Sequence, residues 1–158
     1  MTVKVAINGF GRIGRAILRA NFELEPEQRK IQIVAINDLA SPEANAHLTE
    51  FDSTHGRFGK VINVFKDAIE IEGEKFKCIP KKSSRSSMEK FGCRYCVGMH
   101  RALRIEGEGL ETSTSGRRKV LISAPANDAD ATVVYGVNEK ELTPGHKIVS
   151  NARVLRIV

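Results

Sequence analysis

The sequence predicts an α/β fold, a doubly wound and mostly parallel β-sheet with an antiparallel hairpin at one edge. Short apolar runs at 3–7 and 31–36 have the length and composition of buried parallel strands. Between them, residues 15–20 carry apolar side chains at helical spacing. Residues 61–79 alternate polar and apolar side chains around Glu72-Gly-Glu74, which is typical of antiparallel strands joined by a turn. The strand–helix–strand order predicts a parallel pair with a crossover helix.

The elements are expected in a regular order along the chain. A strand over 2–8 is followed by a helix over 11–23, and a strand over 31–37 is followed by a second helix over 42–49. The remaining strands are expected at 61–66, 69–72, 75–79, 119–123, 132–135 and 147–151.

A glycine-rich turn separates the first strand from the first helix, with the spacing Gly9-x-Gly11-x-x-Gly14. The first glycine permits a tight turn, the second lets the backbone approach a pyrophosphate, and the third lets the helix pack on the strand. Free N–H groups at the helix N-terminus then favour an anion. Asn37-Asp38 ends the second strand, and an acidic residue about twenty positions beyond the glycines is suited to bind both hydroxyls of a ribose. The pattern predicts a Rossmann-type dinucleotide site, and the alternative is a set of glycines that serves turns only.

The charge distribution bears on the class of partner. The net charge is +6, which favours nucleic acid or an anionic surface as a partner. The whole excess lies in 81–119, where ten residues are basic and four are acidic. Only Phe91 and Tyr95 offer aromatic stacking there, so nucleic-acid binding is not expected. No apolar run is long enough to span a bilayer, and the N-terminus reads as a strand rather than a signal peptide, so we expect a cytoplasmic protein without a membrane partner.

Six motifs in order carry a resemblance to a known family. They are Asn8-Gly-Phe-Gly-Arg-Ile-Gly-Arg15, Ala35-Ile-Asn-Asp38, Phe51-Asp-Ser-Thr-His-Gly-Arg-Phe58, Leu121-Ile-Ser-Ala-Pro125, Ala131-Thr-Val-Val-Tyr-Gly-Val-Asn138 and Lys147-Ile-Val-Ser-Asn-Ala152. Over residues 1 to 80 and 119 to 152 the chain resembles the cofactor-binding half of phosphorylating glyceraldehyde-3-phosphate dehydrogenase. The sister family acting on erythrose 4-phosphate shares much of this wording, and Leu121-Ile-Ser-Ala-Pro125 favours the glyceraldehyde enzyme.

The resemblance implies an NAD-dependent glycolytic oxidoreductase that forms homotetramers. In that family a cysteine thiolate attacks a small phosphorylated aldehyde, a hydride passes to NAD, and phosphate attacks the resulting thioester. The residues expected to bind the cofactor are Asn8, Gly9, Phe10, Gly11, Arg12, Ile13, Gly14, Asn37, Asp38, Lys82 and Ser123. No metal site is expected. Because Asp38 would face a 2′-phosphate, NAD is expected to be preferred over NADP.

Two segments depart from the family. Residues 93–101 stand where the family has wording close to V-D-I-V-L-E-C-T-G, and the codons that can encode this chain spell that wording one base later. The tail 153–158 stands where the family has S-C-T-T-N-C, which a shifted frame also spells. We therefore infer frameshifts at about 85–117 and at 153–158. The expected organisation is an NAD-binding domain over 1–152, disrupted over 81–118, followed by an out-of-frame tail, with no substrate domain.

These departures remove the chemistry. Val154 occupies the position of the nucleophilic cysteine, so the chain alone is expected to be inactive. Cys93-x-x-Cys96 is read as accidental rather than as a redox pair or half of a zinc site, and Cys78 as an inert core thiol. Arg94, His100 and Arg101 would bring charge into a buried strand, so 93–101 is expected to be expelled and to leave a gap or a poorly ordered loop in the sheet.

Three functions remain open at this stage. The first is a fragment of an NAD-dependent dehydrogenase, which the motifs favour. The second is a stand-alone nucleotide-binding module without catalysis. The third is a basic nucleic-acid-binding protein that uses residues 81–119.

Overall fold

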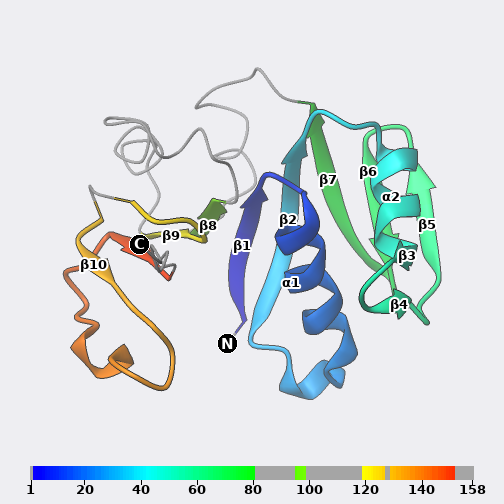
Figure 1. Cartoon of the computed structure of the whole chain (residues 1–158). Coiled ribbons are helices and arrows are strands. Elements are labelled where there is room, and N and C mark those ends of the chain that lie inside the picture. Colours follow the sequence, from blue (N-terminus) through cyan, green and yellow to red (C-terminus); the bar gives the residue numbers. More distant parts are fainter. Residues whose placement is uncertain (1, 81–94, 99–118, 127–128, 152–158) are drawn as a thin grey trace.

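A computed structural model describes residues 2–80, 95–98, 119–126 and 129–151, and Figure 1 shows their arrangement. The first half contains β1 (Val3–Asn8), α1 (Arg12–Glu23), the short 3-10 helix η1 (Pro26–Gln28), β2 (Ile31–Asp38) and α2 (Pro42–Glu50). A small antiparallel pair, β3 (Phe51–Asp52) and β4 (Gly56–Arg57), follows. The next strands are β5 (Ile62–Phe65), β6 (Ala68–Ile71), β7 (Glu74–Pro80) and β8 (Tyr95–Gly98). The last elements are β9 (Lys119–Ile122), β10 (Ala131–Thr132), the 3-10 helix η4 (Glu139–Glu141) and β11 (Ile148–Ser150).

The main sheet has the order β10-β11-β9-β8-β1-β2-β7-β6-β5. The stretch β7-β2-β1-β8-β9-β11 is parallel throughout, and its strands follow the 3-2-1-4-5-6 order of a doubly wound dinucleotide-binding fold. The α/β doubly wound prediction is therefore confirmed. Successive strands are added on one side of β1 as far as β7 and on the other side from β8 onward. In such folds ligands bind at this switch point, between β1 and β8.

The antiparallel edge predicted from the alternating pattern is also present. β5, β6 and β7 form a meander in which β7 pairs in parallel with β2. The turn between β6 and β7 consists of Glu72 and Gly73, with positive φ angles of 51° and 81°. Two successive residues with positive φ make a turn that matches the twist of a hairpin. Glu72, which was predicted to lie in a strand, belongs to this turn.

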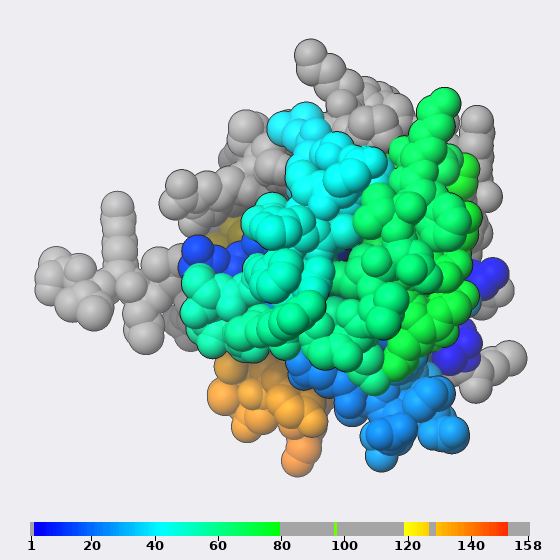
Figure 2. All heavy atoms as spheres, turned by 90° about the vertical axis from the view of Figure 1, so that its right-hand side faces the viewer, coloured from blue at the N-terminus to red at the C-terminus, as the bar shows by residue number. Residues whose placement is uncertain are grey.

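The helices α1 and α2 cover one face of the sheet (Figure 1). Alternate strand residues point to this face and build the main core with the apolar stripe of α1. Figure 2 shows α2 packed beside the meander, and contacts between α2, β5 and β6 agree with this view. The core residues of this cluster are Ile7, Phe10, Leu18, Phe22, Ile33, Ile36, Ala46, Phe58, Ile69, Ile71, Phe76 and Cys78.

The expected gap at 93–101 is wrong for the part that the structure describes. β8 lies between β1 and β9 and pairs in parallel with both. Its four residues, Tyr95 to Gly98, carry no charge, so a short strand can enter the sheet without burying a cation. Arg94, His100 and Arg101, on which the expectation rested, lie outside the described residues, as does most of 85–117.

Strand β10 is shorter than the predicted strand over 132–135. Pairing with β11 ends at Thr132, and the Val133 N–H still donates to the Ser150 carbonyl at 2.7 Å. The chain then turns, because the Val137 N–H donates to the Val134 carbonyl at 3.1 Å and Gly136 has φ of 83°. Of the described helices, neither α1 nor α2 has the length and apolar character needed to cross a membrane.

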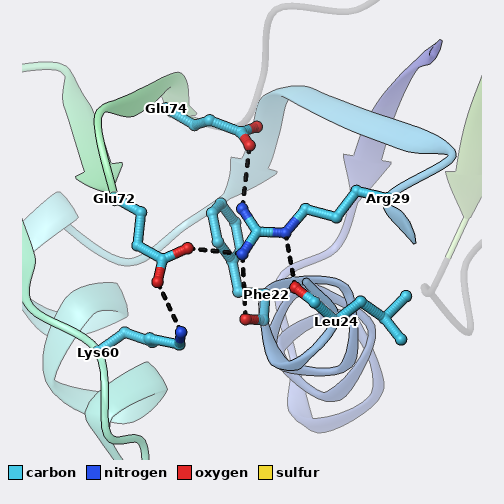
Figure 3. Close-up of polar contacts among 6 residues, drawn as sticks. All are labelled: Phe22, Leu24, Arg29, Lys60, Glu72 and Glu74. Carbon is cyan, nitrogen blue, oxygen red and sulfur yellow. Dashed lines mark hydrogen bonds and ion pairs between the residues drawn. The ribbon is translucent and has the colours of Figure 1, made fainter. Parts of the chain in front are cut away.

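A buried arginine ties the meander to the end of α1 (Figure 3). Arg29 is 7% exposed, and its guanidinium lies 4.6 Å from the centre of the Phe22 ring. It forms ion pairs with Glu72 and Glu74 and donates to the carbonyls of Phe22 and Leu24 at 3.3 and 3.0 Å. Burial lowers the pKa of Arg29, but hydrogen bonds to the two glutamates and their Coulomb attraction together outweigh it, so the net pKa is raised.

A second buried arginine holds the loop between β3 and β4. Arg19 is 5% exposed and donates to the Gly56 carbonyl from both terminal nitrogens at 3.0 Å. It also donates to the carbonyls of His55 at 3.2 Å and Thr49 at 3.5 Å, and lies 5.3 Å from the centre of the Phe58 ring. Among the described residues no carboxylate forms an ion pair with Arg19, so carbonyl dipoles and the face of the Phe58 ring balance its charge.

Candidate cofactor site

The turn between β1 and α1 requires glycine at two positions for different reasons. Gly9 has φ of 98°, a conformation that side chains with a Cβ rarely adopt, and its N–H donates to the Asn37 carbonyl at 2.8 Å. A Cβ on Gly14 would lie 2.6 Å from the Gly9 carbonyl oxygen and 3.1 Å from Cγ2 of Ile7. Gly14 therefore lets α1 pack directly on β1 and its turn. Gly11 faces open space, since a Cβ there would meet nothing within 4 Å.

The N-terminus of α1 opens at this turn without a side-chain cap. Gly11 is the N-cap residue, and the first turn contains no acidic residue. The first hydrogen bond of the helix runs from the Arg15 N–H to the Gly11 carbonyl at 3.0 Å, so the preceding amides have no acceptor within the helix. Arg12 is exposed at the first helical position. These groups together favour a bound anion beside Gly11.

Asp38 lies at the carboxyl end of β2 and faces the glycine-rich turn. Its Oδ2 accepts the Phe10 N–H at 2.8 Å, and its Oδ1 accepts the Ala40 N–H at 3.0 Å. A carboxylate has about four lone-pair positions, so each oxygen retains capacity for a ligand hydroxyl. The carboxylate is thus held in place by the two loops that border the site.

Two asparagines meet beside this carboxylate. Nδ2 of Asn37 donates to Oδ1 of Asn8 at 2.8 Å, where the two residues face each other across β1 and β2. Oδ1 of Asn37 is buried and has no hydrogen-bond partner among the described residues. A buried acceptor without a donor is costly, which is consistent with a position completed by a bound molecule.

The other residues expected to bind the cofactor differ in their burial and in their position in the sheet. The Phe10 side chain is 1% exposed and belongs to the core, so only its backbone faces the site, whereas Ile13 is 52% exposed. Ser123 directly follows β9, at the same carboxyl edge of the sheet. Lys82 and Val154 lie outside the described residues.

Sequence reasoning missed Arg15. Its Nη1 donates to the Phe10 carbonyl at 2.9 Å, and its Nε is buried without an acceptor among the described residues. The signal available in the sequence was a pair of arginines, Arg12 and Arg15, in a helical first turn that lacks acids. Cations are unfavourable at a helix N-terminus unless an anion is also bound there.

No cluster of metal-binding side chains occurs within the described ranges. Cys78 is buried in β7, and burial raises the pKa of its thiol to about 11. A neutral, buried thiol is a poor nucleophile, which agrees with its interpretation as a core residue. The described site therefore presents backbone amides, one carboxylate and polar side chains to a ligand.

Known proteins are similar to this chain over most of its length. The family model described as "Glyceraldehyde 3-phosphate dehydrogenase, NAD binding domain" matches residues 3–98. A glyceraldehyde-3-phosphate dehydrogenase of Xanthobacter flavus is 45% identical over 160 residues, covering 96% of this chain and 45% of that protein. The chromosomal enzyme of the same name from Cupriavidus necator is 40% identical over 157 residues, covering 96% of this chain and 46% of that protein. The chain thus spans less than half the length of these relatives.

Proposed function

We propose that this chain, which belongs to the family of glyceraldehyde-3-phosphate dehydrogenase NAD-binding domains, binds NAD at the carboxyl edge of β1 and β2. The observation that carries the proposal is the pairing of an uncapped helix N-terminus with the Asp38 carboxylate across one glycine-rich turn. The amides that follow Gly11, with Arg12, would hold the pyrophosphate. Asp38 would accept hydrogen bonds from the adenosine ribose.

The same geometry supports a preference for NAD over NADP. A 2′-phosphate on the ribose would lie against the Asp38 carboxylate, whose two oxygens are fixed by the Phe10 and Ala40 amides. Because the carboxylate cannot turn away without losing these bonds, the repulsion cannot be relieved cheaply.

Isothermal titration of the 158-residue chain with NAD and with NADP tests both points. Asp38→Ala should weaken NAD binding by about tenfold or more and should reduce the preference over NADP. Asp52→Ala is the matched control, since Asp52 also accepts two backbone amides, those of Thr54 and His55, both at 2.8 Å, but lies in the loop between β3 and β4. Equal affinity of the unaltered chain for NAD and NADP would contradict the role of Asp38. Salt-dependent oligonucleotide binding without NAD binding would favour a nucleic-acid-binding protein instead.

At the level of the whole enzyme, we propose the reaction of the phosphorylating family. NAD supplies a hydride acceptor, and the substrate would be a small phosphorylated aldehyde. The chain as written carries Val154 at the nucleophile position, so we expect no NADH formation with glyceraldehyde 3-phosphate and phosphate. We attribute about 85–117 and 153–158 to shifted reading frames. Resequencing of the gene tests this, and so does recovery of activity when S-C-T-T-N-C and a downstream substrate domain are restored.

A further inference from the structure

The residue between the first two glycines is held at both ends of its backbone. The Phe10 N–H donates to Asp38 at 2.8 Å, and the Phe10 carbonyl accepts Nη1 of Arg15 at 2.9 Å. The first hydrogen bond is made by a residue at the end of β2 and the second by a residue in the first turn of α1. The Phe10 side chain is buried in the core as a third anchor.

The Arg15 hydrogen bond determines the direction of the next amide. In a trans peptide the C=O and the following N–H point in opposite directions. Since the Phe10 carbonyl points to Arg15, the Gly11 N–H points away from it. Gly11 is exposed, and a Cβ built on it would meet nothing within 4 Å, so a ligand has room to approach the backbone at this end of α1.

Without this hydrogen bond the peptide would have freedom to rotate. Rotation of the Phe10–Gly11 peptide changes ψ of Phe10 and φ of Gly11, and glycine adopts both signs of φ at little cost. Rotation of the Phe10–Gly11 peptide would present a carbonyl oxygen, rather than an N–H group, to a bound anion. Arg15 also stands where a cation opposes the helix dipole, so its position does not serve helix stability.

We propose that Arg15 is a positioning residue for the pyrophosphate of the bound dinucleotide, because it keeps the Gly11 N–H directed at the ligand. Arg15 acts through the Phe10 carbonyl and does not touch the ligand in this proposal. The inference rests on the proposed function, since it needs a diphosphate at this turn. The fixed amide lowers the conformational cost of binding.

The test compares three ligands on the full chain and its variants. Arg15→Met should weaken the binding of NAD and of ADP by about tenfold, the loss expected from one misdirected hydrogen bond to a charged group. Binding of adenosine, which has no phosphate, should be unchanged. Arg15→Lys, which retains a donor, should recover part of the loss. Titration calorimetry measures the affinities for NAD and ADP, and titration followed by NMR chemical shifts measures the affinity for adenosine.

Arg19→Met is the matched control, because Arg19 lies one turn further along α1 and also donates to backbone carbonyls, but to those of Thr49, His55 and Gly56. It should lower the midpoint of urea unfolding and leave the affinity for all three ligands unchanged. If Arg15→Met does not fold, Arg15→Gln replaces it, since its amide is too short to reach the same carbonyl. Unchanged ADP affinity in the Arg15 variants overturns the proposal, and so does an equal loss for ADP and adenosine.

A ligand-free measurement separates this proposal from the proposed function. The Gly11 amide resonance should broaden in Arg15→Met and stay sharp in Arg19→Met, because only the former frees the turn. A sharp, unshifted Gly11 resonance in Arg15→Met overturns the positioning role even if NAD binds. Failure of the unaltered chain to bind NAD or ADP overturns the proposed function and the ligand role of Arg15 with it, whatever the resonance shows.

Discussion

Arg19 and Arg29 are both buried, both stack near a phenylalanine and both donate to backbone carbonyls, yet their charges are balanced differently. Arg29 has two carboxylate partners, Glu72 and Glu74, whereas Arg19 donates to backbone carbonyls and pairs with no carboxylate among the described residues. Removal of the Arg29 cation would leave the carboxylates of Glu72 and Glu74 close together, with Lys60 still paired to Glu72 alone of the two. If Arg19 is replaced, the carbonyl groups that it contacted are neutral, and water can bind those that lie at the loop between β3 and β4. Similar burial therefore does not imply similar contributions to stability.

The largest effect is expected for Arg29→Met. We expect the free energy of unfolding to fall by about 3 kcal/mol, at the lower end for loss of one partner of a buried pair because the glutamate side chains are 33% exposed. Urea unfolding followed by circular dichroism measures the change. A loss equal to that of Arg19→Met would contradict the distinction between the two arginines.

A smaller effect is expected for Arg19→Met. Methionine fills much of the same volume and removes a buried charge that no described carboxylate pairs with, so part of the lost hydrogen bonding is offset. We expect the free energy of unfolding to fall by about 1.5 kcal/mol, measured in the same way. Amide exchange should rise in the loop between β3 and β4 and stay unchanged at the β6–β7 turn. Faster exchange at both places would show that the two clusters are coupled.

The smallest effect is a pH dependence that only one of the two arginines should show. Hydrogen bonds from Lys60 and then from Arg29 lower the pKa of Glu72. A lowered folded pKa means that the stabilisation is complete above the unfolded value of about 4.3 and is lost as the pH falls through the folded value. The stability difference between the unaltered chain and Arg29→Met should therefore narrow below about pH 4, while the difference for Arg19→Met stays constant. If the stability differences of Arg29→Met and Arg19→Met from the unaltered chain change with pH in the same way, the carboxylates do not have the role assigned to them.

Much of the fold could be predicted because its signals are local. The apolar runs that became β1 and β2, the helical stripe of α1 and the alternation of the meander each lie within a few residues of sequence. The glycine spacing likewise predicted a turn whose Gly9 and Gly14 have the geometry described above. The positions expected to bind the cofactor remain predictions, although the structure brings Asn8, Asn37 and Asp38 together.

The contacts that could not be predicted join residues far apart in the chain. The hydrogen bonds of Arg29 to Glu72 and Glu74 span 43 and 45 positions, and that of Phe10 to Asp38 spans 28. Charged residues are ordinarily assigned to the solvent, both in a helix such as α1, which contains Arg19, and in a connection such as that before β2, which contains Arg29, so neither buried arginine was expected. The expectation of a missing central strand failed because charge was counted over nine residues, whereas β8 uses four uncharged ones.

The position of β8 has a consequence for the cooperativity of unfolding. Within the described sheet, β8 is the link between β1 and β9, through four residue pairs on each side. On one side lies the large cluster built on α1, α2 and the meander, and on the other a cluster of three buried residues, Val120, Ile122 and Ile148. Separate cores joined by a narrow connection form separate cooperative units. Loss of β8 pairing would therefore release β9 and β11 as one unit, while the half of the sheet that contains the glycine-rich turn keeps its own core.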